Sequence, residues 1–140
     1  MERGIIVQIS GPVVDVDIQS GELPRLREEL TVEKDGTTRV MEVAQHTGKN
    51  TVRCIMLSPS EGLARGLAVD VPDRTIEVPV GTATLGRMFN VLGQPIDGGG
   101  PMPEGTPRRS IYRKPPAFDE QSPAVEILET GIKVIDLLEP

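Results

Sequence analysis

Residues 80–101 read VGTATLGRMFNVLGQPIDGGGP, and this stretch separates two unlike parts of the chain. The sequence before it alternates repeatedly between apolar and polar side chains, which is the period of half-buried strands. The sequence after it is interrupted by prolines and ends in a run, residues 131–138, whose apolar side chains have helical spacing. We therefore interpret the stretch as a hinge between a β domain and the beginning of a second unit.

The composition favours short strands joined by tight turns. The 140 residues include no Trp, two Phe and one Tyr, so the core must be built from Val, Ile and Leu. Val and Ile together outnumber Leu, and β-branched side chains favour strands. The 15 Gly and 13 Pro supply frequent turns. This composition is typical of an all-β domain.

Strand patterns recur between turn signals through the first part of the chain. They cover residues 3–9, 13–18, 26–33, 38–46, 51–57, 67–71 and 75–80, and residues 125–128 are a later candidate. Asp35 and Gly36 lie between two such runs, which is a strong hairpin signal. Closure into a barrel removes the unpaired edges that invite aggregation. We predict a mainly β fold, with a small closed six-stranded β-barrel over residues 1–79 and the truncated start of an α/β domain over 80–140.

Charge and hydropathy exclude several classes of function. The net charge is −6 and the sequence pI is about 4.8, whereas nucleic-acid binding draws most of its affinity from clustered Lys and Arg. The scarcity of aromatic residues leaves almost no stacking platform for single strands, which disfavours an oligonucleotide-binding barrel. No apolar run approaches the ~18 residues of a membrane span. We expect neither nucleic-acid binding nor membrane insertion.

The N-terminus and the cysteine content favour a cytoplasmic protein. Glu2 and the strand pattern that follows it fit neither a signal peptide nor an Arg-rich transit peptide. Cys54 is the only cysteine, so it has no intramolecular disulfide partner and fits a reducing compartment.

Two segments come close to a phosphate loop, which needs the pattern Gly-x-x-x-x-Gly-Lys-Ser/Thr. In the first, Gly48-Lys49 is followed by Asn50, and Val43 stands where the first glycine belongs. In the second, Gly93 and Gly98 have the right spacing, but another glycine follows where lysine is required. We interpret both segments as turns and find no phosphate loop in these residues.

The other polar candidates in the first part of the chain are interpreted as structural. His46 is the only histidine, so a His cluster or a histidine triad would rest on one residue, and we place it on the surface at a strand end. Cys54 lies in an alternating run and is interpreted as a small buried side chain rather than a nucleophile. Asp15 and Asp17 share a strand face, and we interpret them as solvated carboxylates rather than an acid pair.

The prolines between residues 101 and 118 predict an extended strap laid over a folded surface. A basic group in the strap could contact an anion or pair with an acidic face of a neighbouring subunit. Its members are Arg108, Arg109, Arg113 and Lys114. Asp119 and Glu120 follow as adjacent acids, for which a surface position is the default. We predict no catalytic, cofactor-binding or metal-binding residue in this chain.

Four segments closely resemble the rotary ATPase subunits. They read GIIVQISGPVVDVDI at residues 4–18, SEGLARGLAV at 60–69, IEVPVGTATLGRMFNVLGQPIDGGGP at 76–101 and PPAFDEQSPAVEILETGIKVIDLLEP at 115–140. The resemblance covers essentially the whole chain. The hinge and the LETGIKVID motif at residues 128–136 fall in the order that the family shows.

Within this family, the details resemble the catalytic β subunit of F-type ATP synthase. Residues 117–122 read AFDEQS, which is similar to the β form of the strap, and Glu129 stands where the α subunit more usually shows Gln. The run VVDV at residues 13–16 is also β-like. Vacuolar-type subunits and flagellar or secretion ATPases share parts of the hinge motif but agree less well at the N-terminus.

The resemblance implies a six-stranded barrel that alternates with the barrels of α subunits in a crown holding a hexamer together. It also implies a nucleotide-binding domain that begins near Val80. In the full-length family this domain uses Mg-ATP or ADP, and ATP synthesis or hydrolysis is coupled to proton transport. Because the N-terminus does not resemble a transit peptide, we expect the complex to lie at the inner face of a bacterial cell membrane.

The family's phosphate loop comes shortly after the segment at which this sequence ends, so no catalytic residue is carried over. Contacts with the central rotor stalk would likewise come from regions beyond Pro140. We expect the 140-residue chain to be inactive alone. Two hypotheses remain open: a truncated N-terminal fragment of a catalytic subunit, and a subunit-assembly module without chemistry of its own.

Overall fold

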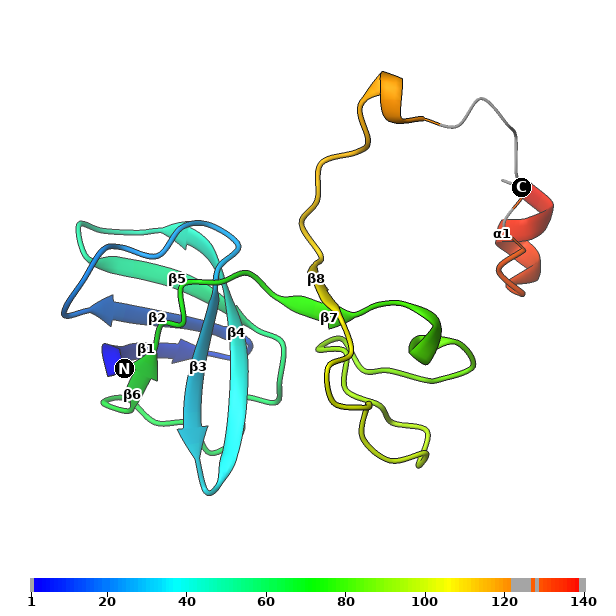
Figure 1. Ribbon diagram of the computed structural model, residues 1–140. Coiled ribbons are helices and arrows are strands. Elements are labelled where there is room, and N and C mark those ends of the chain that lie inside the picture. The colour runs from blue at the N-terminus through cyan, green and yellow to red at the C-terminus, as the bar shows by residue number, and fades with distance from the viewer. Residues whose placement is uncertain (1, 122–126, 128, 139–140) are drawn as a thin grey trace.

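Six strands form a closed barrel in the N-terminal part of the chain (Figure 1). The computed structural model describes residues 2–121, 127 and 129–138. The barrel strands are β1 (Glu2–Ser10), β2 (Val13–Ile18), β3 (Glu29–Lys34), β4 (Thr37–His46), β5 (Thr51–Met56) and β6 (Ala68–Asp70). Their order is β1-β2-β5-β4-β3-β6, with β6 pairing back onto β1, and every pairing is antiparallel. The predicted six-stranded barrel is confirmed.

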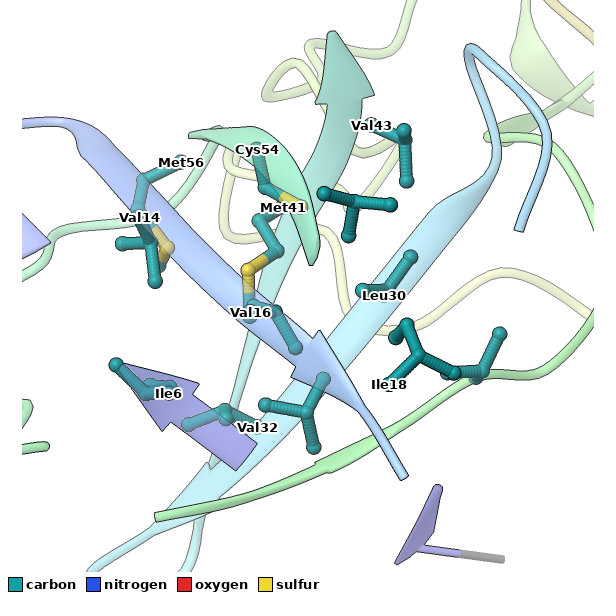
Figure 2. Close-up of a cluster of buried hydrophobic side chains, with 13 residues drawn as sticks. Ile6, Val14, Val16, Ile18, Leu30, Val32, Met41, Val43, Cys54 and Met56 are labelled. Atoms are coloured by element: carbon teal, nitrogen blue, oxygen red, sulfur yellow. The ribbon is translucent and has the colours of Figure 1, made fainter. Parts of the chain in front are cut away.

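Alternation along the strands fills the barrel with aliphatic side chains. In β2, Val14 and Val16 are fully buried, and on the neighbouring strand Val52 and Cys54 lie opposite them. Figure 2 shows this cluster, with Met41 among its labelled side chains. The buried members are Ile6, Val14, Val16, Ile18, Leu30, Val32, Met41, Val43, Val52, Cys54, Met56, Val69 and Val71. Full burial of such a side chain contributes about 1.5–3 kcal/mol.

The β3–β4 hairpin follows the sequence signal closely. Lys34 pairs with Thr37, so only Asp35 and Gly36 form the loop. Both have positive φ, 55° and 71°, as a type I′ turn requires. The predicted hairpin at these two residues is confirmed.

The strand predicted at residues 26–33 begins later than its apolar pattern indicates. Leu26 and Arg27 form a turn, and Arg27 has a φ of 72°, which is incompatible with an extended strand. Strand β3 therefore starts at Glu29. The prediction placed the start of this strand wrongly because one residue in the left-handed region is enough to end a strand.

The run predicted as a strand at residues 75–80 lies outside the barrel. Strand β7 (Glu77–Pro79) pairs with β8 (Arg108–Ser110) in a separate two-stranded sheet. Figure 1 shows β7 and β8 crossing beside the barrel. The later elements are the 3₁₀ turns η1 (Thr82–Thr84) and η2 (Phe118–Glu120) and the helix α1 (Lys133–Leu138).

Helix α1 confirms the helical spacing read from residues 131–138, although it starts two residues later. The candidate strand at 125–128 lies outside the described residues except for Ile127. Over the described ranges, the chain contains no helix with the length and apolar character needed to cross a membrane.

Candidate functional site: the barrel wall and the strap

Both near matches to a phosphate loop lie in turns, as predicted. Gly48, Lys49 and Asn50 form the bend between β4 and β5, where the Gly48 N–H donates to the Thr51 carbonyl at 3.2 Å. Gly93 lies at the turn of a hairpin-like loop formed by residues 87–97, which we call the linker hairpin. Its N–H donates to the carbonyl of Asn90 at 3.0 Å.

Polar contacts hold the linker hairpin at both ends. At the turn, the Asn90 side-chain oxygen accepts from the N–H groups of Leu92 and Gln94 at 3.0 and 2.9 Å. At the open end, the Arg87 guanidinium makes a two-pronged ion pair with Asp97. That guanidinium, assisted by the N–H groups of Gly99 and Met88, holds the pKa of Asp97 well below its usual range.

The linker hairpin packs directly on β7 at Gly93. A Cβ atom on this glycine would lie 2.5 Å from Cδ of Pro79 and 3.2 Å from Cα of Val78. Gly93 also has a φ of 70°, which favours glycine. The turn therefore approaches the strand more closely than any other residue type permits.

His46 and Cys54 lie where the sequence predicted. His46 is exposed at the end of β4, and its Nε2 lies 2.8 Å from the carbonyl oxygen of Pro24. Cys54 is fully buried in the barrel. Burial, with a smaller contribution from the Asp15 charge, raises the pKa of its thiol to about 12. A thiol held in its neutral form is a poor nucleophile, which agrees with the structural interpretation.

The interpretation of Asp15 as a solvated carboxylate was wrong. Asp15 is only 8% exposed, and its two oxygens each accept from Arg53 at 2.8 Å. The cause is tertiary, because register places Arg53 of β5 directly opposite Asp15 of β2. This two-pronged hydrogen bond outweighs burial and lowers the pKa of Asp15. Asp17 is half-buried, with its Oδ1 3.5 Å from the Thr51 hydroxyl.

Two glutamates face each other across β3 and β4, and each has its own partner. Glu29 and Glu42 are directly paired in register, an arrangement that is destabilising for like charges. Arg74 binds Glu29 through both carboxylate oxygens, at 3.1 and 3.3 Å. The Tyr112 hydroxyl lies 2.7 Å from each carboxylate oxygen of Glu42. On the outer face of β3 and β4, the carboxylates of Glu29 and Glu42 thus bind two later parts of the chain, through Arg74 and Tyr112.

The strap (residues 101–118) lies along the chain that leaves the barrel. The N–H of Val80 donates to the Pro107 carbonyl at 2.9 Å, and the N–H of Ile111 donates to the Ile76 carbonyl at 3.1 Å. The hydroxyls of Thr75 and Ser110 lie 2.6 Å apart. These contacts confirm that this part of the strap is extended over a folded surface.

The four basic residues of the strap do not act as one cluster. Arg108 donates to the Glu77 carbonyl at 2.7 Å, beside β7. Arg113 and Lys114 line a separate hollow together with Glu120 of η2. Asp119 and Glu120 are exposed in η2, as predicted.

A groove of about 390 Å³ runs between the barrel wall and the linker hairpin. Its lining includes Thr31, Val40, Arg74, Leu92, Gln94 and Arg108. Its two arginines already hold Glu29 and the Glu77 carbonyl. Within the described part of the chain, no three or more His, Cys, Asp or Glu side chains are grouped so that they could hold a metal ion.

A comparison with protein families identifies the barrel. Residues 6–70 match the family model described as the ATP synthase alpha/beta family, beta-barrel domain. The matched range begins within β1 and ends with β6, so it spans the closed sheet. The barrel belongs to the ATP synthase alpha/beta family. This match supports an N-terminal portion of a rotary ATPase α/β subunit.

The contacts around this α/β-family barrel include residues that sequence reasoning did not single out. Tyr112, Glu42 and Arg27 meet at the barrel wall, although 70 positions separate the tyrosine from the glutamate. The only available signal was that Tyr112 is the sole tyrosine of the chain. No periodicity links these three residues, because the barrel and the strap bring them together only in the fold.

Proposed function

We propose that this chain is the N-terminal portion of the catalytic β subunit of a rotary F-type ATP synthase, and that its barrel contacts neighbouring α subunits. The observation that carries the proposal is the family match over residues 6–70, which coincides with a closed, well-packed barrel. The β-like runs at residues 13–16 and 117–122 and Glu129 support the choice of subunit.

The proposal assigns the chemistry to the parent subunit. That subunit would use Mg-ATP and ADP in ATP synthesis or hydrolysis coupled to proton transport, and it would meet the central rotor stalk through other regions. Its complex would lie at the inner face of the bacterial cell membrane. We assign no catalytic residue to these 140 residues, since they contain no phosphate-loop pattern.

Association with α subunits tests the proposed role of the barrel. The chain is co-expressed with an F-type α subunit or, separately, with the non-catalytic subunit of a vacuolar-type enzyme, and each mixture is analysed by native mass spectrometry. We expect a complex with the α subunit and much less with the vacuolar-type partner. A wild-type chain that is folded by circular dichroism but forms no complex with the α subunit would contradict the proposal.

A pair of matched variants controls for loss of the fold. Leu30 is fully buried in the barrel, whereas Leu85 is 76% exposed beyond it. We expect Leu30→Ala to weaken the complex with the α subunit because it destabilises the barrel. Leu85→Ala removes the same atoms outside the barrel and leaves the complex intact.

The second candidate function is an assembly module without nucleotide chemistry. The observation that favours it is the self-contained barrel core, whose members all lie at or before Val71. Calorimetric titration with Mg-ATP addresses the catalytic property directly. Under both candidates we expect the 140-residue chain to show no saturable micromolar binding of Mg-ATP. Such binding would show that these residues contain a nucleotide site, and it would contradict both candidates.

A further inference from the structure

The strap touches the barrel at one aromatic side chain, Tyr112. Its hydroxyl lies 2.7 Å from both carboxylate oxygens of Glu42 in β4. The guanidinium carbon of Arg27 lies 4.7 Å from the centre of its ring, within cation–π range. The N–H of Tyr112 donates to the Ser110 hydroxyl at 3.1 Å, which fixes the backbone just before the ring. Tyr112 is thus held by three contacts: its hydroxyl binds Glu42, its ring lies against Arg27, and its backbone N–H binds Ser110.

The two barrel partners of Tyr112 are oriented by other barrel contacts. Arg74 occupies the carboxylate of Glu29, which leaves the opposing Glu42 to accept from the strap. Arg27 has a φ of 72°, uncommon for a residue other than glycine, and its N–H donates to the Val43 carbonyl of β4 at 2.8 Å. The barrel therefore holds Arg27 in a strained backbone conformation, and from this position the Arg27 side chain covers the Tyr112 ring.

We propose that Tyr112, Glu42 and Arg27 form a latch that ties the strap to the barrel and makes the barrel and the β7–β8 sheet move as one body. The chain already leaves the barrel through residues 71–76, where the N–H of Glu29 donates to the Arg74 carbonyl. Tyr112 adds a second attachment, which restricts rotation of the sheet about the first. When the latch opens, the attachment through residues 71–76 remains. Tyr112 is a positioning residue in this arrangement.

Tyr112 can be observed selectively by ultraviolet absorbance, because it is the only tyrosine in the chain and the chain contains no tryptophan. Alkaline titration followed by ultraviolet absorbance measures ionisation of this one phenol. In Glu42→Gln the acceptor charge is lost, so we expect the midpoint to fall toward that of the urea-unfolded chain. Glu33→Gln is the matched control on β3, where Glu33 is exposed, and we expect its midpoint to equal that of the wild type. A Glu42→Gln midpoint equal to that of the wild type would overturn the latch.

Tryptic cleavage after Arg113 measures opening of the latch. Tyr112→Phe keeps the ring beneath Arg27 but removes the hydroxyl. We expect cleavage to be faster by at least on the order of tenfold, which is the scale of one hydrogen bond to a charged group. Adding Glu42→Gln to Tyr112→Phe should accelerate cleavage no further, because both changes remove the same bond. Wild-type cleavage rates in Tyr112→Phe, or fully additive effects in the double variant, would refute the proposal.

Discussion

The barrel buries large apolar side chains in its core, whereas the segment that follows β7 leaves several such side chains exposed. In the barrel, Leu30 and Met41 are fully buried. Beyond it, Leu85 is 76% exposed, and Phe118 is 92% exposed. A sheet that closes on itself buries one whole face, whereas a hairpin and a strap without a second layer cannot. The barrel therefore has a core of its own, and the conformation of the later segment depends on interactions other than apolar packing.

In the later segment, polar contacts and turns at glycine residues determine the backbone conformation. The linker hairpin depends on Asn90 at its turn and on the Arg87–Asp97 ion pair at its open end. Exposed polar contacts contribute little stability individually. In a segment held in this way, apolar side chains such as Leu85 and Phe118 remain exposed.

Thiol labelling should show the largest difference between the two regions. Only the thiolate reacts, and burial raises the pKa of Cys54 to about 12. We expect Cys54 to be alkylated on the order of 10³-fold more slowly in the native protein than in urea, because labelling requires the barrel to open. In Leu85→Cys, the added thiol should react at the rate of a free cysteine. Mass spectrometry of peptides from the same molecule compares both sites, and equal rates would remove the distinction.

Truncation of a leucine in each region measures the same difference as stability. Leu30→Ala should lower the free energy of unfolding by about 2–5 kcal/mol, because it leaves a cavity in the core. Leu85→Ala should change it by no more than about 0.5 kcal/mol, as is usual for surface positions. Urea unfolding followed by circular dichroism provides both values. A large loss in Leu85→Ala would mean that the later segment has a core of its own.

Two glycines of the linker segment separate backbone strain from close packing. Gly93 and Gly98 both have positive φ, 70° and 74°, so alanine adds comparable backbone strain at each. Only at Gly93 would the new methyl group also meet Pro79 and Val78. We expect Gly93→Ala to lose about 1–3 kcal/mol more local stability than Gly98→Ala. Hydrogen exchange at the Ile96 amide, which is bonded to Met88, measures it. Equal exchange in the two variants would show that the turn does not press on β7.

Acid titration tests a polar contact within the barrel. Arg53 lowers the pKa of folded Asp15 from 3.8, so the ion pair adds stability above that value and loses it as the pH falls through the lower folded pKa. We expect Asp15→Asn to remove roughly 1 kcal/mol at neutral pH and to flatten the acid-side slope. Asp35→Asn in the exposed β3–β4 turn is the matched control, and it should keep the wild-type slope. Urea midpoints between pH 5 and 2 give the comparison.

The fold was largely predictable where a local pattern maps directly onto geometry. Alternation identified the barrel strands, and Asp35-Gly36 identified the hairpin, because period and turn type are local properties. The start of β3 was missed because Arg27 is in the left-handed region, where its N–H donates to the Val43 carbonyl of another strand, a contact that no local pattern indicates. The departure of β7 from the barrel was missed because its partner, β8, lies some thirty positions later in the chain.

The sequence by itself determined the strand content, the aliphatic core and the placement of Cys54 within it, because side-chain period and turn chemistry are written in neighbouring residues. The tertiary structure decided which charges are paired. Register set Arg53 against Asp15, and the return of the strap carried Tyr112 to Glu42. Such pairs depend on contacts between residues far apart in the chain, and a single sequence carries no local signal for them.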